Sequence, residues 1–153
     1  MTAPESGGQP TTGPPDRRTL RLLERQFSAE PIVEETVFDP NSDEPRELRV
    51  RLDDEQYPSK VTAGRLDCRW FTTGDFSFHY VESMASDERW ECRWDRHPNA
   101  HNDRLHFHQP PAGNDTTDLE LPSLHPRDVL SVVLAAVETR IEQWWDEVEA
   151  TDE

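Results

Sequence analysis

The chain has 153 residues, enough for one domain with one modest core. Its 32 Asp and Glu residues outnumber its 16 Lys and Arg residues, which gives a formal net charge of −16. No run of about 18 apolar residues is present and the N-terminus lacks the order of a signal peptide, so we expect a cytoplasmic protein without a membrane segment. The two cysteines, Cys68 and Cys92, are too few for a disulfide framework and lack the spacing of a zinc knuckle.

The charge balance points to an environment rich in salt. Fifteen of the basic residues are Arg, and Lys60 is the one Lys. This composition resembles that of proteins from halophiles, in which dense carboxylates hold water and cations while salt screens their mutual repulsion. A mesophilic acidic protein is the alternative interpretation.

The chain begins with a segment of low complexity. Residues 1–15 consist mostly of Pro, Gly, Ser, Thr and Gln, so they bury little apolar surface and we predict a disordered arm. We predict one domain over residues 16–149 and a disordered tail over residues 150–153. An amphipathic helix is predicted from Asp16, a capping residue, through Phe27.

From Ile32 onward the apolar residues alternate with a period of two. Six runs show this pattern, IVEETVF, RELRVRL, RLDCRWF, DFSFHYVE, RWECRWD and RLHFH, with Pro, Gly, Asn and Asp between them. After Pro126 the apolar spacing changes to three and four and continues to Val148. We therefore predict an α+β fold, a twisted antiparallel sheet of about five or six strands with a long C-terminal helix packed on one face.

Strand side chains alternate between the two faces of a sheet, so each run can be divided by parity. One parity is apolar and predicts the core face: Leu48, Val50, Leu52, Leu66, Cys68, Trp70, Phe76, Phe78, Tyr80, Trp90, Cys92, Trp94, Leu105 and Phe107. The other parity is charged and carries Arg49, Arg51, Arg65, Asp67, Arg69, His79, Arg89, Glu91, Arg93, Asp95, Arg104, His106 and His108. Arg suits forked contacts with phosphate or carboxylate, but alternating Arg and acids also indicate simple cross-strand ion pairs.

Five of the six histidines lie within thirty residues, accompanied by Asp95 and Asp103: His79, His97, His101, His106 and His108. Three roles are open to them, namely proton transfer or anion contact, metal binding through two His and a carboxylate, and solvated surface residues. His106 and His108 are two apart in a strand, so both rings point to one side. We expect them to form a concave site with Arg93 and at least one of His79, His97 and His101.

The strings FSFHYVE, WECRWDRHPNAH, LHFH and LPSLHPRDVLSVVLAAVE, in this order, resemble the TumE family of toxins from toxin–antitoxin modules. The resemblance covers about residues 65–140, and it differs at Arg96, where the family usually has Asn. It implies an antitoxin protein as partner and interference with RNA. The matching positions are Tyr80, Arg93, Asp95, His97, Pro98, His101, His106 and His108.

The leading hypothesis is a toxin-like protein that acts on RNA, and one form of it is a metal-independent ribonuclease that needs no cofactor. In this hypothesis His106 and His108 transfer protons, with His101 and Asp95 in the same catalytic group. The predicted substrate-binding residues are Arg93, Arg104, Tyr80, His97 and His79. The alternative is a non-enzymatic interaction module that binds an antitoxin or another acidic partner through the same Arg and His face.

Overall fold

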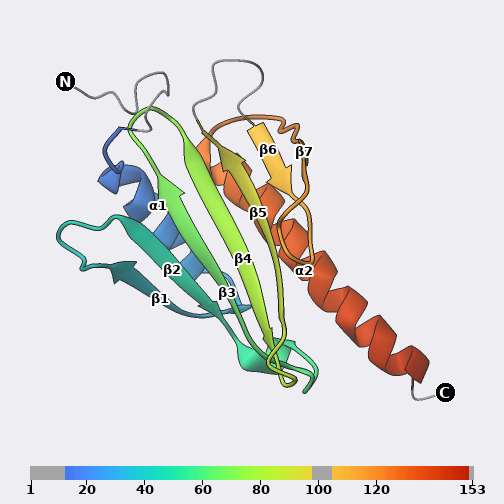
Figure 1. The fold of residues 1–153 in the computed structure, drawn as a ribbon. Helices are drawn as coiled ribbons and strands as arrows, with labels where there is room; N and C mark the ends of the chain where they lie inside the picture. The colour runs from blue at the N-terminus through green and yellow to red at the C-terminus, as the bar shows by residue number, and fades with distance from the viewer. Residues whose placement is uncertain (1–12, 98–104, 152–153) are drawn as a thin grey trace.

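A computed structural model describes residues 13–97 and 105–151 of the chain. It confirms the α+β fold, with seven antiparallel strands in the described residues rather than five or six. The strands lie in the sheet in chain order (Figure 1). They are β1 (Val33–Asp39), β2 (Glu47–Leu52), β3 (Val61–Trp70), β4 (Phe76–Met84), β5 (Arg89–Arg96), β6 (Leu105–His108) and β7 (Thr116–Asp118), and a short 3-10 helix, η1 (Asp54–Gln56), precedes β3.

The first helix, α1 (Arg17–Ser28), begins where the sequence predicts it. The Asp16 side chain caps it, accepting hydrogen bonds from the Thr19 backbone N–H at 3.0 Å and from the Thr19 hydroxyl at 2.9 Å. The described residues of the predicted N-terminal arm, 13–15, lie against the turn between β3 and β4, where the Pro14 carbonyl accepts a hydrogen bond from the Thr72 backbone. Residues 1–12 lie outside the described part of the chain.

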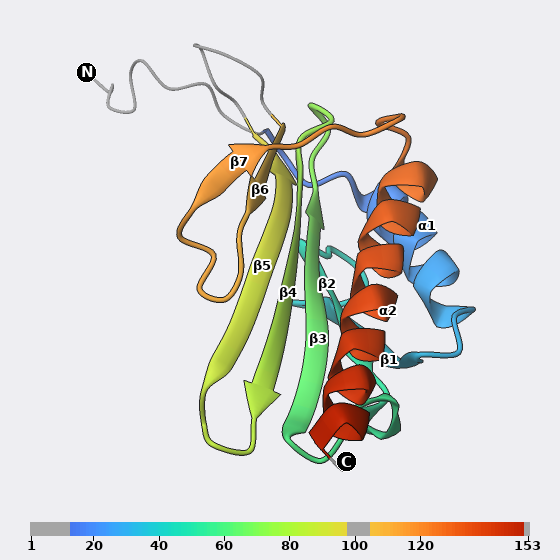
Figure 2. The same cartoon turned by 90° about the vertical axis from the view of Figure 1, so that its right-hand side faces the viewer.

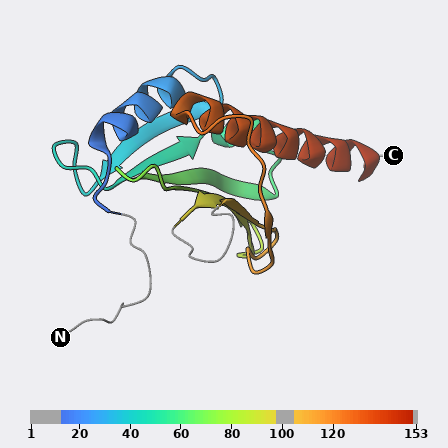
Figure 3. The ribbon, with the colours of Figure 1, turned by 90° about the horizontal axis from the view of Figure 1, so that it is seen from above.

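The second helix, α2 (Pro126–Thr151), packs with α1 on the same face of the sheet (Figures 2 and 3). Its buried stripe recurs at spacings of three and four and consists of Val129, Leu130, Val133, Leu134, Val137 and Ile141. The predicted packing of the C-terminal helix is confirmed, and α1 shares the sheet face with it. Neither helix in the described residues has the length and apolar composition needed to cross a membrane.

The sheet has one covered face and one face without a helix, which we call the open face. All residues of the predicted core face are buried or pack against the core, and Cys68 and Cys92 are buried free thiols within it. Burial raises the pKa of Cys92 to about 12, as expected for a thiol without a role in chemistry. The open face carries the charged residues of the alternating pattern, and it faces the viewer in Figure 1.

Candidate functional site

Five charged or histidine side chains gather at one end of the open face, on β5, β6 and the residue after β5. Strand register brings them together, because Arg93 pairs with His108 and Asp95 pairs with His106. His97 follows β5 directly, and its ring stacks on that of His106 with centroids 5.0 Å apart. We call these five residues the Asp95 cluster: Arg93, Asp95, His97, His106 and His108.

Asp95 lies at the centre of the cluster and is 4% exposed. Its Oδ2 accepts a hydrogen bond from Arg93 Nε at 3.0 Å and lies 2.9 Å from His108 Nε2. Arg93 Nη2 lies 3.2 Å from the same His108 nitrogen. One nitrogen cannot donate to Asp95 and accept from Arg93 at once, so the position of the proton decides which contact is a hydrogen bond.

The environment of His108 favours its neutral form. Burial lowers the pKa of His108 below its ordinary value, Asp95 opposes this shift, and Arg93 adds to it. The His108 side chain is 15% exposed, so it is partly accessible to solvent.

The other oxygen of Asp95 has a different neighbourhood. Oδ1 lies 3.7 Å from His97 Nε2 and 3.9 Å from His106 Nδ1. Oδ1 and His106 Nδ1 are both buried, and neither makes a hydrogen bond within the described residues. One ligand atom from each of these three residues lies within 4.8 Å of the others, the arrangement of a candidate metal site.

The arginines of the open face are held by carboxylates. Arg49, Arg51, Arg65, Arg69, Arg89 and Arg93 each have a side-chain nitrogen within 4.0 Å of a carboxylate oxygen. Glu47 binds two of them, Arg49 and Arg69, and both use Nε. Within the described residues, the Nη groups of these two arginines donate no hydrogen bond to the protein. They remain able to bind an anion.

A hollow of about 480 Å³ opens beside the Asp95 cluster. Arg69, His79 and Arg93 line it together with Glu47, Asp67, Phe71 and Ser77. His79 Nε2 lies 2.8 Å from Glu91 Oε1, so a carboxylate orients this ring as well. The lining of the hollow therefore combines guanidinium and imidazole groups with carboxylates.

The structure places Tyr80, a predicted substrate-binding residue, apart from the Asp95 cluster. Tyr80 is 1% exposed on the covered face, where its hydroxyl donates to Glu82 Oε2 at 2.6 Å. Its parity is that of Phe78, so its side chain points away from the open face. The resemblance supplied the role, whereas alternation placed the residue in the core. His101 and Arg104 lie outside the described residues.

Arg69 belongs to the site although the sequence analysis did not select it. It was placed on the charged parity, but only the register of β3 against β4 shows that it lies opposite Ser77, at the rim of the hollow. Strand register sets this placement, and parity alone does not reveal it.

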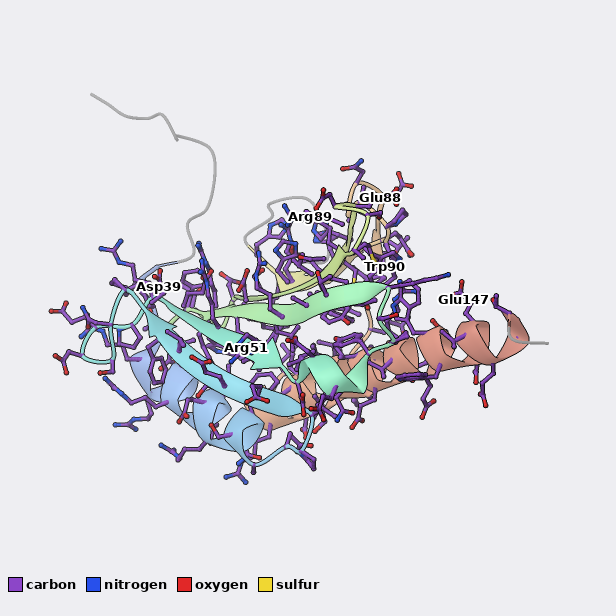
Figure 4. The ribbon with its side chains drawn as sticks, turned by 90° about the horizontal axis from the view of Figure 1, so that it is seen from below. Asp39, Arg51, Glu88, Arg89, Trp90 and Glu147 are labelled. Atoms are coloured by element: carbon purple, nitrogen blue, oxygen red, sulfur yellow. The ribbon has the colours of Figure 1, made fainter. Side chains whose placement is uncertain are left out.

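A hollow of about 610 Å³ lies elsewhere, and none of the predicted site residues lines it. It lies between the β4–β5 end of the sheet and the C-terminal part of α2, near Glu88, Arg89, Trp90 and Glu147 in Figure 4. The Arg140 guanidinium lies over the Trp90 ring at 3.8 Å and over the Trp144 ring at 4.7 Å. These contacts stabilise the packing of α2.

Comparison with known proteins assigns the chain to a family. No curated protein and no solved structure gives a significant match. The family described as toxin TumE matches residues 19–144, a range that contains both helices' buried stripes and the whole sheet. Because this match spans most of the chain, the protein belongs to the TumE toxin family.

Proposed function

We propose that this protein is the toxin of a toxin–antitoxin module and that it acts on RNA through the open face. The observation that carries the proposal is the Asp95 cluster beside a hollow lined by Arg69, His79 and Arg93. RNA offers a phosphate at every nucleotide, and planar guanidinium groups suit phosphate oxygens. The proposed setting is the cytoplasm, where RNA and a protein antitoxin are both present.

The phosphate would lie between Arg69 and Arg93 in the hollow. Glu47 holds Arg69 through Nε at 3.0 Å, and Asp95 holds Arg93 through Nε at 3.0 Å. A guanidinium fixed in this way directs its Nη groups without a large loss of side-chain entropy on binding. The arrangement favours one phosphate held by two guanidiniums from β3 and β5.

His108 is the proposed proton-transfer residue. It accepts the proton of the ribose 2′-hydroxyl as the 2′-oxygen forms a bond to phosphorus and the bond from phosphorus to the 5′-oxygen breaks. The products are a 2′,3′-cyclic phosphate and a 5′-hydroxyl, and the proton taken up returns to the 5′-oxygen through water. Asp95 orients the ring in this step, and proton transfer by a positioned side chain supplies a factor of about 10²–10⁴ in rate.

A second function, binding of a protein partner without chemistry, is favoured by the ion pairs themselves. Every described open-face arginine already contacts a carboxylate, as on a sheet whose charges serve solubility and pairing. An antitoxin or another acidic partner would then bind the exposed guanidinium groups. The two functions differ in whether His108 is needed.

The test uses induced expression and the purified chain in molar KCl. Wild type is expected to arrest growth and cleave RNA to products with cyclic phosphate ends. His108→Ala should lower cleavage by about 10²–10⁴ and restore growth. His125→Asn is the matched control, because His125 is exposed at the start of α2, away from the open face. Growth arrest without RNA cleavage, equal in wild type and His108→Ala, would instead support the interaction module.

A further inference from the structure

We propose that Asp95, His97 and His106 bind one divalent transition-metal ion of the Zn²⁺ type. One ligand atom from each of the three residues lies within 4.8 Å of the others, and Asp95 Oδ1 faces His97 Nε2 and His106 Nδ1. Metal binding was one of the three roles that the sequence left open for the histidines. The proposal concerns binding alone and does not rest on the action on RNA.

The burial of the ligand atoms carries the proposal. The Asp95 side chain is 6% exposed, and its Oδ1 makes no hydrogen bond within the described residues. His106 Nδ1 is buried in the same way, 3.9 Å from that oxygen. A buried acceptor and a buried ring nitrogen without partners each cost free energy, which a shared cation would recover.

The spacing is close to that of a coordination site. Metal–ligand distances of about 2.0–2.2 Å place the ligand atoms of a tetrahedral site about 3.3 Å apart. Asp95 Oδ1 lies 3.7 Å from His97 Nε2 and 3.9 Å from His106 Nδ1. Each of these two distances exceeds the tetrahedral spacing by less than about 1 Å. The two rings are already stacked, with centroids 5.0 Å apart and 29° between the ring planes.

The ligand types select the class of metal. Two imidazole nitrogens and one carboxylate oxygen suit Zn²⁺, Co²⁺ or Ni²⁺, whereas Mg²⁺ and Ca²⁺ prefer oxygen alone. Three protein ligands leave a fourth position for water. The second oxygen of Asp95 is held by Arg93 Nε at 3.0 Å, the outer hydrogen bond that commonly orients a metal-binding carboxylate.

The same atoms could instead form an ion pair between Asp95 and a protonated histidine. The two arrangements make different predictions for metal binding. The test is a titration of the purified full chain with Co²⁺ after treatment with a chelator, followed by visible absorption and by displacement with Zn²⁺. We expect saturation at one ion per chain, without the charge-transfer absorption of a thiolate, since Cys68 and Cys92 are buried elsewhere in the core.

Variants identify the ligands. His97→Ala and His106→Gln should each weaken Co²⁺ binding by at least about 100-fold, since even outer-shell changes cost 10–100-fold. His97 is 45% exposed, so its variant keeps the test valid if His106→Gln fails to fold. His125→Asn should bind as wild type does. The proposal would be overturned if the wild-type chain did not bind Co²⁺ or if its Co²⁺ complex showed thiolate absorption. It would also be overturned if the His97 and His106 variants bound Co²⁺ with the affinity of the wild type.

Discussion

The guanidinium of Arg140, on α2, lies against the carboxylate of Glu82, on β4, with Nη2 3.0 Å from Oε1 and Nε 3.1 Å from Oε2. Glu82 is fully buried and also accepts hydrogen bonds from Trp144 Nε1 at 3.0 Å and from the Tyr80 hydroxyl at 2.6 Å. Breaking a buried pair from one side leaves an uncompensated charge, at a cost of about 3–5 kcal/mol. We expect Arg140→Met to lower the free energy of unfolding by this amount, measured by denaturant titration.

Two further variants test the cause of that loss. Adding Glu82→Gln to Arg140→Met removes the buried charge and should recover part of the lost stability. Arg127→Met, at an exposed position of the same helix, should change the free energy of unfolding little. Equal stability of Arg140→Met and wild type would show that the pair does not hold α2 on the sheet.

The contact between α2 and the sheet is expected to fail when a charge enters it without a partner. Ile141 is 8% exposed within the core, and Ile141→Asp should therefore unfold the domain, because a buried unpaired carboxylate costs several kcal/mol. Thr139→Asp is the matched control at an exposed position two residues earlier. Thermal melting of both variants tests this prediction. An unchanged melting temperature for Ile141→Asp would contradict the packing of α2 on the sheet.

A third prediction concerns the close approach of Gly64 to Tyr57. A Cβ atom at residue 64 would lie 2.6 Å from Cζ and 2.9 Å from Cε2 of the Tyr57 ring. The ring has little freedom to move, because its hydroxyl lies 2.6 Å from that of Tyr80. We expect Gly64→Ala to destabilise the fold by about 1–3 kcal/mol. If the clash is the cause, the same substitution should cost much less in a Tyr57→Leu background, and an equal cost in both backgrounds would exclude it.

The alternation of apolar residues predicted both faces of the sheet, because a strand fixes the side of each side chain once one neighbour is assigned. It could not predict β7, since Thr116–Asp118 is short and exposed and forms only by pairing with β6. It also missed Glu82, a buried charge on the apolar parity of β4. Its partner Arg140 lies next to the apolar stripe of α2. The pair would therefore be recognised only by noticing a charged residue beside the apolar positions of both β4 and α2.

The candidate site was predicted in composition but not in geometry. Parity placed His106, His108 and Arg93 on one face, and the structure brings them together. The central position of Asp95 depends on the register between β5 and β6, which alternation leaves open. The different surroundings of its two oxygens depend on how residue 97 leaves β5, and no sequence pattern encodes that direction.

The acidic composition predicts that the fold depends on ionic strength. A formal net charge of −16 on 153 residues produces strong self-repulsion when little salt is present. We expect circular dichroism to show the folded protein in molar KCl and loss of structure in dilute buffer. Sodium chloride at matched ionic strength is a useful second condition, because it changes only the cation and so separates screening from a need for potassium. Identical spectra at high and low salt would contradict the halophilic interpretation.

The last prediction separates guanidinium geometry from charge in the proposed contact with RNA. Arg69 binds Glu47 through Nε at 3.0 Å, which leaves its Nη groups for a phosphate. A Lys at this position keeps the charge but has one ammonium group, which cannot reproduce both contacts of the planar fork. Arg69→Lys should therefore weaken binding of a short single-stranded RNA by about 1.5–3 kcal/mol, tenfold or more in Kd. Arg25→Lys, at an exposed position of α1, is the control, and all measurements need one KCl concentration because phosphate contacts depend on salt. Equal RNA affinity of Arg69→Lys and wild type would exclude a forked phosphate contact at this residue.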